Sequence, residues 1–448
     1  MNPLIIDAFS IILTKLSDQE KLFLLVCSKE IMAALEKYVL FNESIKIKKI
    51  LNSHFFHCFT NIIVDDYLMY TSQKTVGLYN QPLLLPKKLK TMKIADDYVK
   101  SIDGYIPSTV TCLILSHYFK EPLNDIPSSI THLTFGAHFN SYLTLSSTIT
   151  HLKFGHHFDQ KIINFPPNLV SLTFGNFFNQ EIDNLPSTVI HLKLGSNFNK
   201  SIKNIPISVT HLEFNSDHEC YENMFNELSS TVTYLHLGDG FNKPISKKIP
   251  QSIRFLYLGN SFNCFIGDSI MNLNLIKYLI FGNDFNQPIR GSIPSSVTHL
   301  CFGNCFNQII KENDLSHITH LQFNHNFNRS MRQINLSSLI HLGFGNNFNL
   351  SLNGSILPKV THLFFGDNFN KPINGNFIPA VTHIVFGRKY NQPFDSLPPS
   401  VTHIKFYNVQ TDETIKFLEE KSINISYQTY KVKKYSEFSY KRYFQQFD

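Results

Sequence analysis

The 448-residue chain contains no tryptophan, and its seven cysteines are odd in number and irregularly spaced. Cysteines of this kind do not indicate a disulfide framework, so we expect a reducing compartment. The sequence has no run of 18 apolar residues, which argues against a membrane span. Its first residues lack a basic region and include Asp7, which argues against a signal peptide. We therefore expect an intracellular, cytoplasmic protein with no membrane partner.

Charged residues are also scarce, at 17% of the chain, and the net charge is only +6. This mild bias alone does not indicate nucleic acid. The C-terminal tail is basic through Lys431, Lys433, Lys434, Lys441 and Arg442, which we interpret as a solvated face; the alternative is a nucleic-acid contact. No nucleophile–base set, phosphate loop or metal cluster stands out, so we expect neither an enzyme nor a cofactor nor a metal site.

One segment is repeated sixteen times between residues 90 and 407. Two clean copies read LPSTVIHLKLGSNFNKSI (185–202) and LPKVTHLFFGDNFNKPI (357–373). The residue before the strand leucine, here called the marker, recurs every 19 to 23 residues. The markers are Thr91, Cys112, His132, His151, Ser171, His191, His211, Tyr234, Phe255, Tyr278, His299, His320, His341, His362, His383 and His403. A fixed period in this range is typical of a solenoid built from stacked coils.

Apolar and polar residues alternate around each marker. The position two before and the position one after are aliphatic in all sixteen copies, and the position three after is Phe in eleven. This alternation predicts a short, half-buried strand in each coil, and the stacked strands would form a parallel sheet with phenylalanines packed inside. Glycine follows in eleven copies, where we expect a turn that tolerates positive φ.

Phe-Asn follows the glycine turn, as in Phe369-Asn370. We expect each asparagine to point inward and to hydrogen bond with backbone groups of the next coil, because buried backbone groups need partners. The alternative is that asparagine only tolerates a left-handed turn. Asn328 and Asn349 lie in N-x-S sequons at this position, and their expected burial argues against glycosylation.

The Phe-Asn-x-Pro-Ile units, such as FNQPI (285–289) and FNKPI (369–373), resemble FNIP repeats. These are a divergent leucine-rich-repeat type found in social amoebae and in giant viruses of amoebae. The resemblance covers roughly residues 76 to 407 and implies a β-rich, leucine-rich-repeat-like solenoid with a parallel sheet. The pattern departs from the family at 217–219, where Phe-Asn is replaced, and in the 23-residue spacings that end at Tyr234 and Tyr278.

Residues 1–45 do not repeat and predict a small α-helical segment, with Ser17 and Glu20 as a capping box. The segment resembles an F-box, which implies docking to a Skp1-type adaptor of a cullin–RING ubiquitin ligase. The residues expected to bind the adaptor are Leu4, Ile12, Leu16, Leu22, Leu25 and Val26. The Pro3-Leu4 order and the missing tryptophan depart from the family pattern. The alternative is a helical cap over the first coil.

The expected organisation has four parts. They are an F-box-like segment (1–45), degenerate first coils or an N-terminal cap (46–89), the repeats (90–407), and a C-terminal cap with a basic tail (408–448). In the last part, 412–421 reads as a short helix and 422–432 as a final strand that covers the last coil.

The markers should point away from the core, onto what we call the outer sheet face. Ten of the sixteen are His, which predicts a ladder of stacked, neutral imidazoles. A metal array is the alternative, but no acidic or thiol co-ligands recur beside the histidines. Crowded imidazoles resist protonation, so stability should fall below about pH 6.

The histidine ladder is interrupted by aromatic residues, which predict a partner-binding patch. The aromatic patch comprises Tyr234, His236, Phe255, Tyr257, Tyr278 and Ile280, with Cys301 beside it. The alternative is drift within a degenerate repeat. Together these features favour the substrate-receptor subunit of a cullin–RING ligase with an unknown protein target. The alternative is a protein-binding scaffold with no ligase link.

Overall fold

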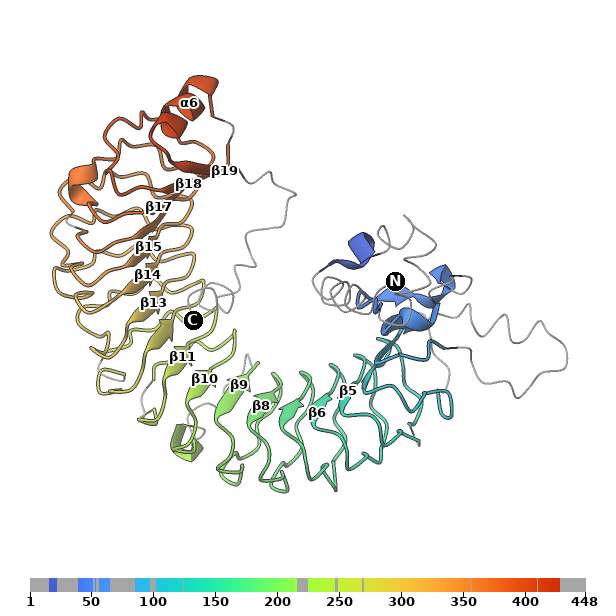
Figure 1. The fold of residues 1–448 in the computed structure, drawn as a ribbon. Helices are drawn as coiled ribbons and strands as arrows, with labels where there is room; N and C mark the ends of the chain where they lie inside the picture. Colours follow the sequence, from blue (N-terminus) through green and yellow to red (C-terminus); the bar gives the residue numbers. More distant parts are fainter. Residues whose placement is uncertain are drawn as a thin grey trace, which may run out of the picture. The chain divides into compact units, whose positions relative to one another are not determined.

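The computed structural model describes residues 16–21, 39–50, 53, 56–64, 85–96, 102–123, 125–215, 225–245, 249–267, 270–355, 357–408 and 410–427. The chain divides into two compact units, Met1–Gly238 and Asp239–Asp448. Within each unit, short strands lie side by side in chain order, one strand to a coil (Figure 1).

The first unit contains ten of the described strands, all parallel to their neighbours. They are β1 (Ile45–Lys46), β2 (Asn61–Val64), β3 (Thr91–Ile94), β4 (Cys112–Ile114), β5 (His132–Thr134), β6 (His151–Lys153), β7 (Ser171–Thr173), β8 (His191–Leu194), β9 (His211–Phe214) and β10 (Tyr234–His236). Two 3-10 turns, η1 (Ile47–Lys49) and η2 (Phe56–Cys58), lie between β1 and β2. The first strand, β1, begins at Ile45, the last residue of the segment expected to be F-box-like, and β2 lies in the segment expected to hold degenerate first coils.

The second unit contains nine described strands, again parallel. They are β11 (Phe255–Tyr257), β12 (Tyr278–Ile280), β13 (His299–Cys301), β14 (His320–Gln322), β15 (His341–Gly343), β16 (His362–Phe364), β17 (His383–Phe386), β18 (His403–Phe406) and β19 (Asn424–Tyr427). A 3-10 turn, η3 (Gly375–Phe377), precedes β17. The predicted C-terminal helix and strand are confirmed as α6 (Asp412–Glu420) and β19.

Strand register follows the repeat without a slip. Within each unit, marker pairs with marker from one coil to the next, as in His299 with His320, and the strand leucines pair beside them. Leu300 and Leu321 are fully buried, as predicted for the position after the marker. A one-residue shift would turn every leucine to the outer sheet face, so the apolar pattern specifies the register.

Two columns of stacked phenylalanine rings fill the interior of each unit. In the second unit, the ring centroids of Phe281 and Phe302 lie 5.4 Å apart with an interplanar angle of 6°. A second column comes from the Phe-Asn positions, and its rings pack against the first, with Phe302 and Phe306 3.8 Å apart. The predicted phenylalanine core is confirmed, and it explains why a chain without tryptophan uses 41 phenylalanines.

The repeat glycines serve a different purpose from the one predicted. Among them only Gly238 and Gly259 have positive φ, both 89°. At Gly303 a Cβ atom would lie 1.8 Å from the carbonyl oxygen of Gly282, and at Gly136 it would lie 1.6 Å from that of Ser116. Glycine is therefore required because adjacent coils bring their backbones into contact, and positive φ matters at two coils only.

The described part of the N-terminal segment includes a helical turn at 18–21. The predicted capping box is confirmed: the Ser17 amide donates to Glu20 Oε2 at 2.8 Å, and the Glu20 amide donates to Ser17 Oγ at 3.3 Å. Lys21 is 5% exposed, and its ammonium donates to Asp18 Oδ1 and to the Leu40 carbonyl, both at 2.9 Å. These bonds tie the turn to the chain just before β1.

Candidate partner-binding surface

The predicted histidine ladder is present on the outer sheet face of both units. In the first unit, the ring centroids of His132 and His151 are 4.1 Å apart, and those of His191 and His211 are 4.3 Å apart. In the second unit, six successive rings run from His299 to His403 with neighbouring centroids 4.1–4.5 Å apart. The stacking of imidazoles is therefore confirmed.

Threonines fix the tautomer of many of these histidines. The residue before the marker is Thr in most copies, and the Thr319 hydroxyl lies 2.9 Å from His320 Nδ1. The same hydroxyl donates to the Thr298 carbonyl of the preceding coil at 3.1 Å. Since a hydroxyl has one proton, it must accept from Nδ1–H, which makes Nε2 the unprotonated nitrogen. In agreement, His403 Nε2 lies 3.3 Å from the Asn424 amide nitrogen, a donor.

The six residues of the predicted aromatic patch fall in two units. Tyr234 and His236 belong to β10 of the first unit, and both are half-buried. Burial, followed by the charge of Glu213, raises the pKa of Tyr234, which is consistent with a phenol held against the sheet.

The other patch residues come together on β11 and β12 of the second unit. Phe255, Tyr257 and Tyr278 are half-buried and pack against Ile280 and Cys301. The Tyr278 ring lies 4.4 Å from that of His299, so it continues the histidine ladder. The Tyr257 hydroxyl donates to Asn260 Oδ1 at 2.8 Å, which fixes that ring.

The prediction that Ile280 and Cys301 are exposed is wrong. Each is only 1% exposed, although both lie on the outer sheet face and not on the inner face that holds the strand leucines. The reason is packing on the outer sheet face itself, where three aromatic rings crowd around these smaller side chains. Burial also raises the pKa of the Cys301 thiol, so this sulfur is a packing group. In the second unit, the accessible part of the patch is therefore formed by Phe255, Tyr257 and Tyr278.

The predicted asparagine ladder is confirmed in its bonding and wrong in its placement. Along 140–199 and 242–391, each ladder residue accepts through its side-chain oxygen from the backbone amide of its counterpart one coil later. For example, the Asn307 amide donates to Asn286 Oδ1 at 2.9 Å, and the Asn328 amide donates to Asn307 Oδ1 at 3.0 Å. The side chains are partly or fully exposed, including Asn328 of the sequon. Burial of the adjacent phenylalanine leaves the asparagine at the surface, where its oxygen still reaches the next coil.

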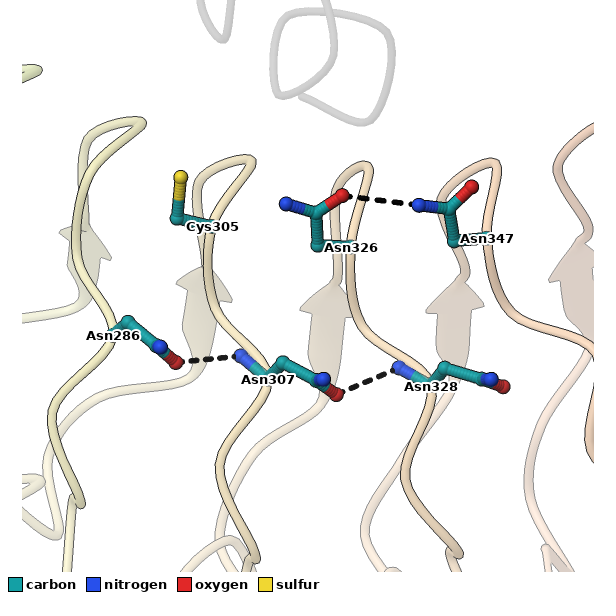
Figure 2. Close-up of a pocket in the computed structure, with 6 residues that line it drawn as sticks. All are labelled: Asn286, Cys305, Asn307, Asn326, Asn328 and Asn347. Atoms are coloured by element: carbon teal, nitrogen blue, oxygen red, sulfur yellow. Dashed lines mark hydrogen bonds between the residues drawn. The ribbon is translucent and has the colours of Figure 1, made fainter.

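Two rows of polar side chains line an open pocket of about 600 Å³ in the second unit (Figure 2). One row belongs to the asparagine ladder and the other lies at the tips of the turns. The lining residues are Asn286, Cys305, Asn307, Asn326, Asn328 and Asn347. In the tip row, the Asn347 amide donates to Asn326 Oδ1 at 3.0 Å. The pocket is uncharged and open, and its amides mainly serve to join coils.

A second aromatic surface, not predicted from the sequence, lies at the turn tips of the first unit. Tyr118, His138, His157 and Phe177 form a continuous stack with neighbouring centroids 4.8–5.3 Å apart. Tyr118 is 52% exposed and Phe177 43% exposed. Burial and neighbouring charges, first that of His157, lower the pKa of His138. The sequence does contain a signal for this stack. In four successive copies, an aromatic ring or an imidazole directly precedes Phe-Asn or the Phe-Lys or Phe-Asp that replaces it.

Most of the predicted adaptor-binding residues lie outside the described residues. These are Leu4, Ile12, Leu22, Leu25 and Val26. Leu16 is described and half-buried, directly before the capping box. The confirmed cap shows that a helix begins at the predicted place, while adaptor binding stays a prediction.

Among the described residues, Cys58, Cys112, Cys264, Cys301 and Cys305 are not joined in disulfides. Among the residues placed by the structure, no three His, Cys, Asp or Glu side chains converge as a metal site. No helix in the same residues is long and apolar enough to cross a membrane.

Comparison with known proteins identifies the repeat. Segments 142–177, 178–217, 225–261, 274–305 and 369–408 match the FNIP Repeat family model. These matches fall within the region that resembled FNIP repeats in the sequence. No curated protein matches the chain.

The chain is also similar to the crystal structure of CroV588, described as a novel circular LRR protein structure, with a TM-score of 0.58 and 28% identity. The match covers 84% of this chain and 64% of that one, so the chain spans less than two thirds of its length. A match to pneumococcal vaccine antigen PcpA has a TM-score of 0.18 and 14% identity over 83% of this chain and 80% of that one, too low to indicate a shared fold. The chain is thus a leucine-rich-repeat-like parallel β-solenoid with segments that match the FNIP Repeat model.

Proposed function

We propose that this solenoid binds a protein through the outer sheet face of its second unit. The observation that carries the proposal is the lack of charge on this face. Across the nine strands β11–β19, the markers and the residues two after them include one charged side chain, Lys405. Neutral imidazoles and aromatic rings occupy most of the remainder. Depletion of charge with enrichment of Tyr and Phe is typical of the centre of a protein–protein interface.

The aromatic patch is the best-placed anchor on this face. Phe255, Tyr257 and Tyr278 present partly exposed rings on a rigid support, because the buried Ile280 and Cys301 hold them from below. Fixed aromatic rings lose little conformational entropy on binding, which favours them as hot spots.

A protein capture experiment tests this surface. The immobilised full chain should retain a specific protein from lysate, and the Tyr257→Ser/Tyr278→Ser variant should lose it without unfolding. The matched control is Tyr105→Ser/Tyr142→Ser in the first unit, where the two side chains are 43% and 79% exposed. Equal capture by both double variants would refute a role for the patch.

We further propose that the N-terminal segment docks to a Skp1-type adaptor, which would make the chain a substrate receptor of a cullin–RING ubiquitin ligase. Support comes from the F-box-like sequence of residues 3–29 and from the capping box that begins its second helix. A scaffold with no ligase link is the alternative, in which this helix only covers the first coil.

Adaptor binding separates the two functions. The full chain should bind a purified Skp1-type adaptor, and a Leu16→Asp/Leu22→Asp/Leu25→Asp variant should not, with the circular dichroism of the solenoid unchanged. Gln19→Asp is the control, because Gln19 is exposed on the same helical turn. Absence of binding by the unaltered chain would leave the scaffold function.

A further inference from the structure

The histidine ladder of the second unit ends in three successive imidazoles with the same tautomer. At His362, His383 and His403, the hydroxyl of the preceding threonine lies 2.9 Å from Nδ1. Each of these hydroxyls donates to a carbonyl of the preceding coil at 3.2–3.4 Å, so each accepts from Nδ1–H. The three Nε2 atoms are therefore unprotonated acceptors.

Stacking arranges these acceptors as a row. The ring centroids of His362 and His383 are 4.5 Å apart with an interplanar angle of 8°, and those of His383 and His403 are 4.4 Å apart at 3°. Parallel rings hold their lone pairs side by side instead of aiming them at one point. Such a row cannot surround a single cation, but it can accept one hydrogen bond per coil from separate donors.

One donor of this kind is already present in the chain. The side-chain amide nitrogen of Asn424 lies 3.3 Å from His403 Nε2. Asn424 occupies the marker position of β19 and pairs with His403 in the strand register. At the end of the solenoid, a neutral amide N–H therefore satisfies a ladder acceptor.

We propose that the partner of this face presents neutral amide N–H groups, from Asn and Gln side chains, to the Nε2 row of the ladder. The inference rests on the proposed function, because it names the chemistry of the protein that the outer sheet face of the second unit binds. An amide side chain carries two N–H donors. Acceptors that an interface covers without supplying donors lose their bonds to water, which weakens binding. A partner with amide side chains avoids that loss.

Charged partners fit the same row less well. A carboxylate would bring its own acceptor lone pairs against those of Nε2. A cationic group could donate, but Lys405 lies on this face two residues after His403. At the other end of the ladder, the charge of Lys277 contributes, after burial and His320, to the lowered pKa of His299. A buried cation here would meet lysines and neutral acceptors, without a carboxylate to pair with.

The first unit offers a comparison within the same chain. His132 and His151 have the same threonine contacts at Nδ1, at 2.9 Å. The neighbouring markers on either side are Cys112 and Ser171, so this row stops after two imidazoles. The threonine beside His151 therefore supplies a matched control for variants in the second unit.

Nitrogen NMR of the isotope-labelled full chain tests the acceptor row, because protonated and unprotonated imidazole nitrogens resonate far apart. At neutral pH, His383 and His403 should show a protonated Nδ1 and an unprotonated Nε2. The Thr382→Val/Thr402→Val variant removes the two hydroxyls that fix this tautomer. Its signals should shift toward the Nε2–H form, which predominates in free imidazole side chains.

Three synthetic peptides then measure the preference for donors, followed at the His383 and His403 signals in physiological salt. One peptide alternates Gln and Thr, and its counterparts carry Glu or Lys in place of Gln. The Gln peptide should bind with a Kd at least about tenfold lower than either counterpart. Thr382→Val/Thr402→Val should weaken it several-fold, and Thr150→Val, the matched change beside His151, should leave it unaffected.

Several results would overturn the inference. They are a protonated Nε2 in the unaltered chain, equal Kd values for the three peptides, tighter binding of the Glu or Lys peptide, or unchanged binding in Thr382→Val/Thr402→Val. The capture experiment decides the proposed function separately. A partner lost in Tyr257→Ser/Tyr278→Ser, together with no preference for Gln, would keep the proposed function and remove the inference. A preference for Gln with no captured partner would support the donor row and count against the proposed function.

Discussion

Gly303 lies at a point where two successive coils come closest together. The carbonyl oxygen of Gly282 occupies the space that a Cβ at Gly303 would need, at 1.8 Å. Displacing this carbonyl oxygen would cost free energy, because the neighbouring strands fix its position.

A methyl group at this position should therefore push the coils apart. Gly303→Ala is expected to lower the free energy of unfolding by about 1–3 kcal/mol, the usual cost of overpacking. Urea denaturation measures the loss. Asn304→Ala is the control, because that side chain is exposed one residue later. Equal stability of the two variants would contradict the close contact.

The asparagine ladder depends on one acceptor oxygen per coil. Asp159 replaces asparagine in one copy, and its carboxylate still accepts from the Asn179 backbone amide at 2.8 Å. The backbone amide of Asp159 in turn donates to Asn140 Oδ1 at 2.9 Å. The amide nitrogen of the asparagine side chain is therefore dispensable for the coil-to-coil bond.

This exchange predicts a sharp difference between two substitutions at Asn307. Asn307→Ala removes the acceptor for the Asn328 amide and should cost about 1 kcal/mol. Asn307→Asp keeps the acceptor and should cost clearly less. Thermal denaturation of the two variants side by side measures the difference, and a larger loss in the aspartate variant would be evidence against the ladder.

At the scale of the element, the strands of the second unit bring imidazoles together at the marker. Burial, followed by repulsion from neighbouring histidines, lowers the pKa of His341 to about 3. Burial, followed by the charges of His320 and Lys277, lowers the pKa of His299 to about 3. No carboxylate contributes to either shift.

These shifts set the direction of the pH dependence. An unfolded histidine has a pKa near 6.5, so above this pH neither state gains protons and stability is at its maximum. Below about pH 6.5 these histidines take up protons in the unfolded chain but not in the folded chain. The free energy of unfolding therefore falls until the pH approaches about 3. The urea midpoint should therefore drop between pH 8 and pH 5.

A variant isolates the contribution of the ladder. In His299→Phe/His341→Phe the rings still stack but cannot titrate, so the midpoint should change less with pH. A flat midpoint for the unaltered chain would refute the neutral ladder.

Much of the structure at the level of strands and helices could be predicted, because the sequence signals were local and most of them were repeated. The strand alternation, the phenylalanine columns, the capping box at Ser17 and the helix at α6 all depend on neighbouring residues. The errors arose where the neighbour one coil away decides the outcome. Gly303 is constrained by the backbone of Gly282, and Ile280 is buried in part by Phe255 and Tyr257 of the neighbouring strand β11.

The candidate site was less predictable for the same reason. The sequence located the aromatic patch, but which of its residues stay accessible depends on packing across strands. The stack of Tyr118, His138, His157 and Phe177 can be recognised when the coils are aligned, but no single copy of the repeat predicts it.

At the scale of the molecule, stability in a solenoid is a sum over coils and interfaces, so the last coil needs a cover. In the second unit, Leu418 of α6 is fully buried beside β19. Thr411 caps the helix by accepting from the Thr414 amide at 3.3 Å.

Removing the Leu418 side chain should act locally. Leu418→Ala is expected to cost about 2–5 kcal/mol within the terminal coils. Hydrogen exchange should speed up at β17 to β19 while β3 to β6 in the first unit stay protected. Leu275→Ala, at a leucine that is 50% exposed, is the control. Uniform loss of protection along the chain would show instead that the solenoid unfolds as one cooperative body.

The asparagine ladder also has a consequence for how such a chain can lengthen. Along 140–199 and 242–391, successive ladder residues join one coil to the next through a side-chain oxygen and a backbone amide, and Asp159 shows that the two contacts tolerate a change of residue. The upper and lower surfaces of one coil are therefore complementary to each other. A tandem duplication of one 21-residue unit in the gene would insert a coil that fits both neighbours at once, so the number of coils is free to vary between descendants while the strand register is kept.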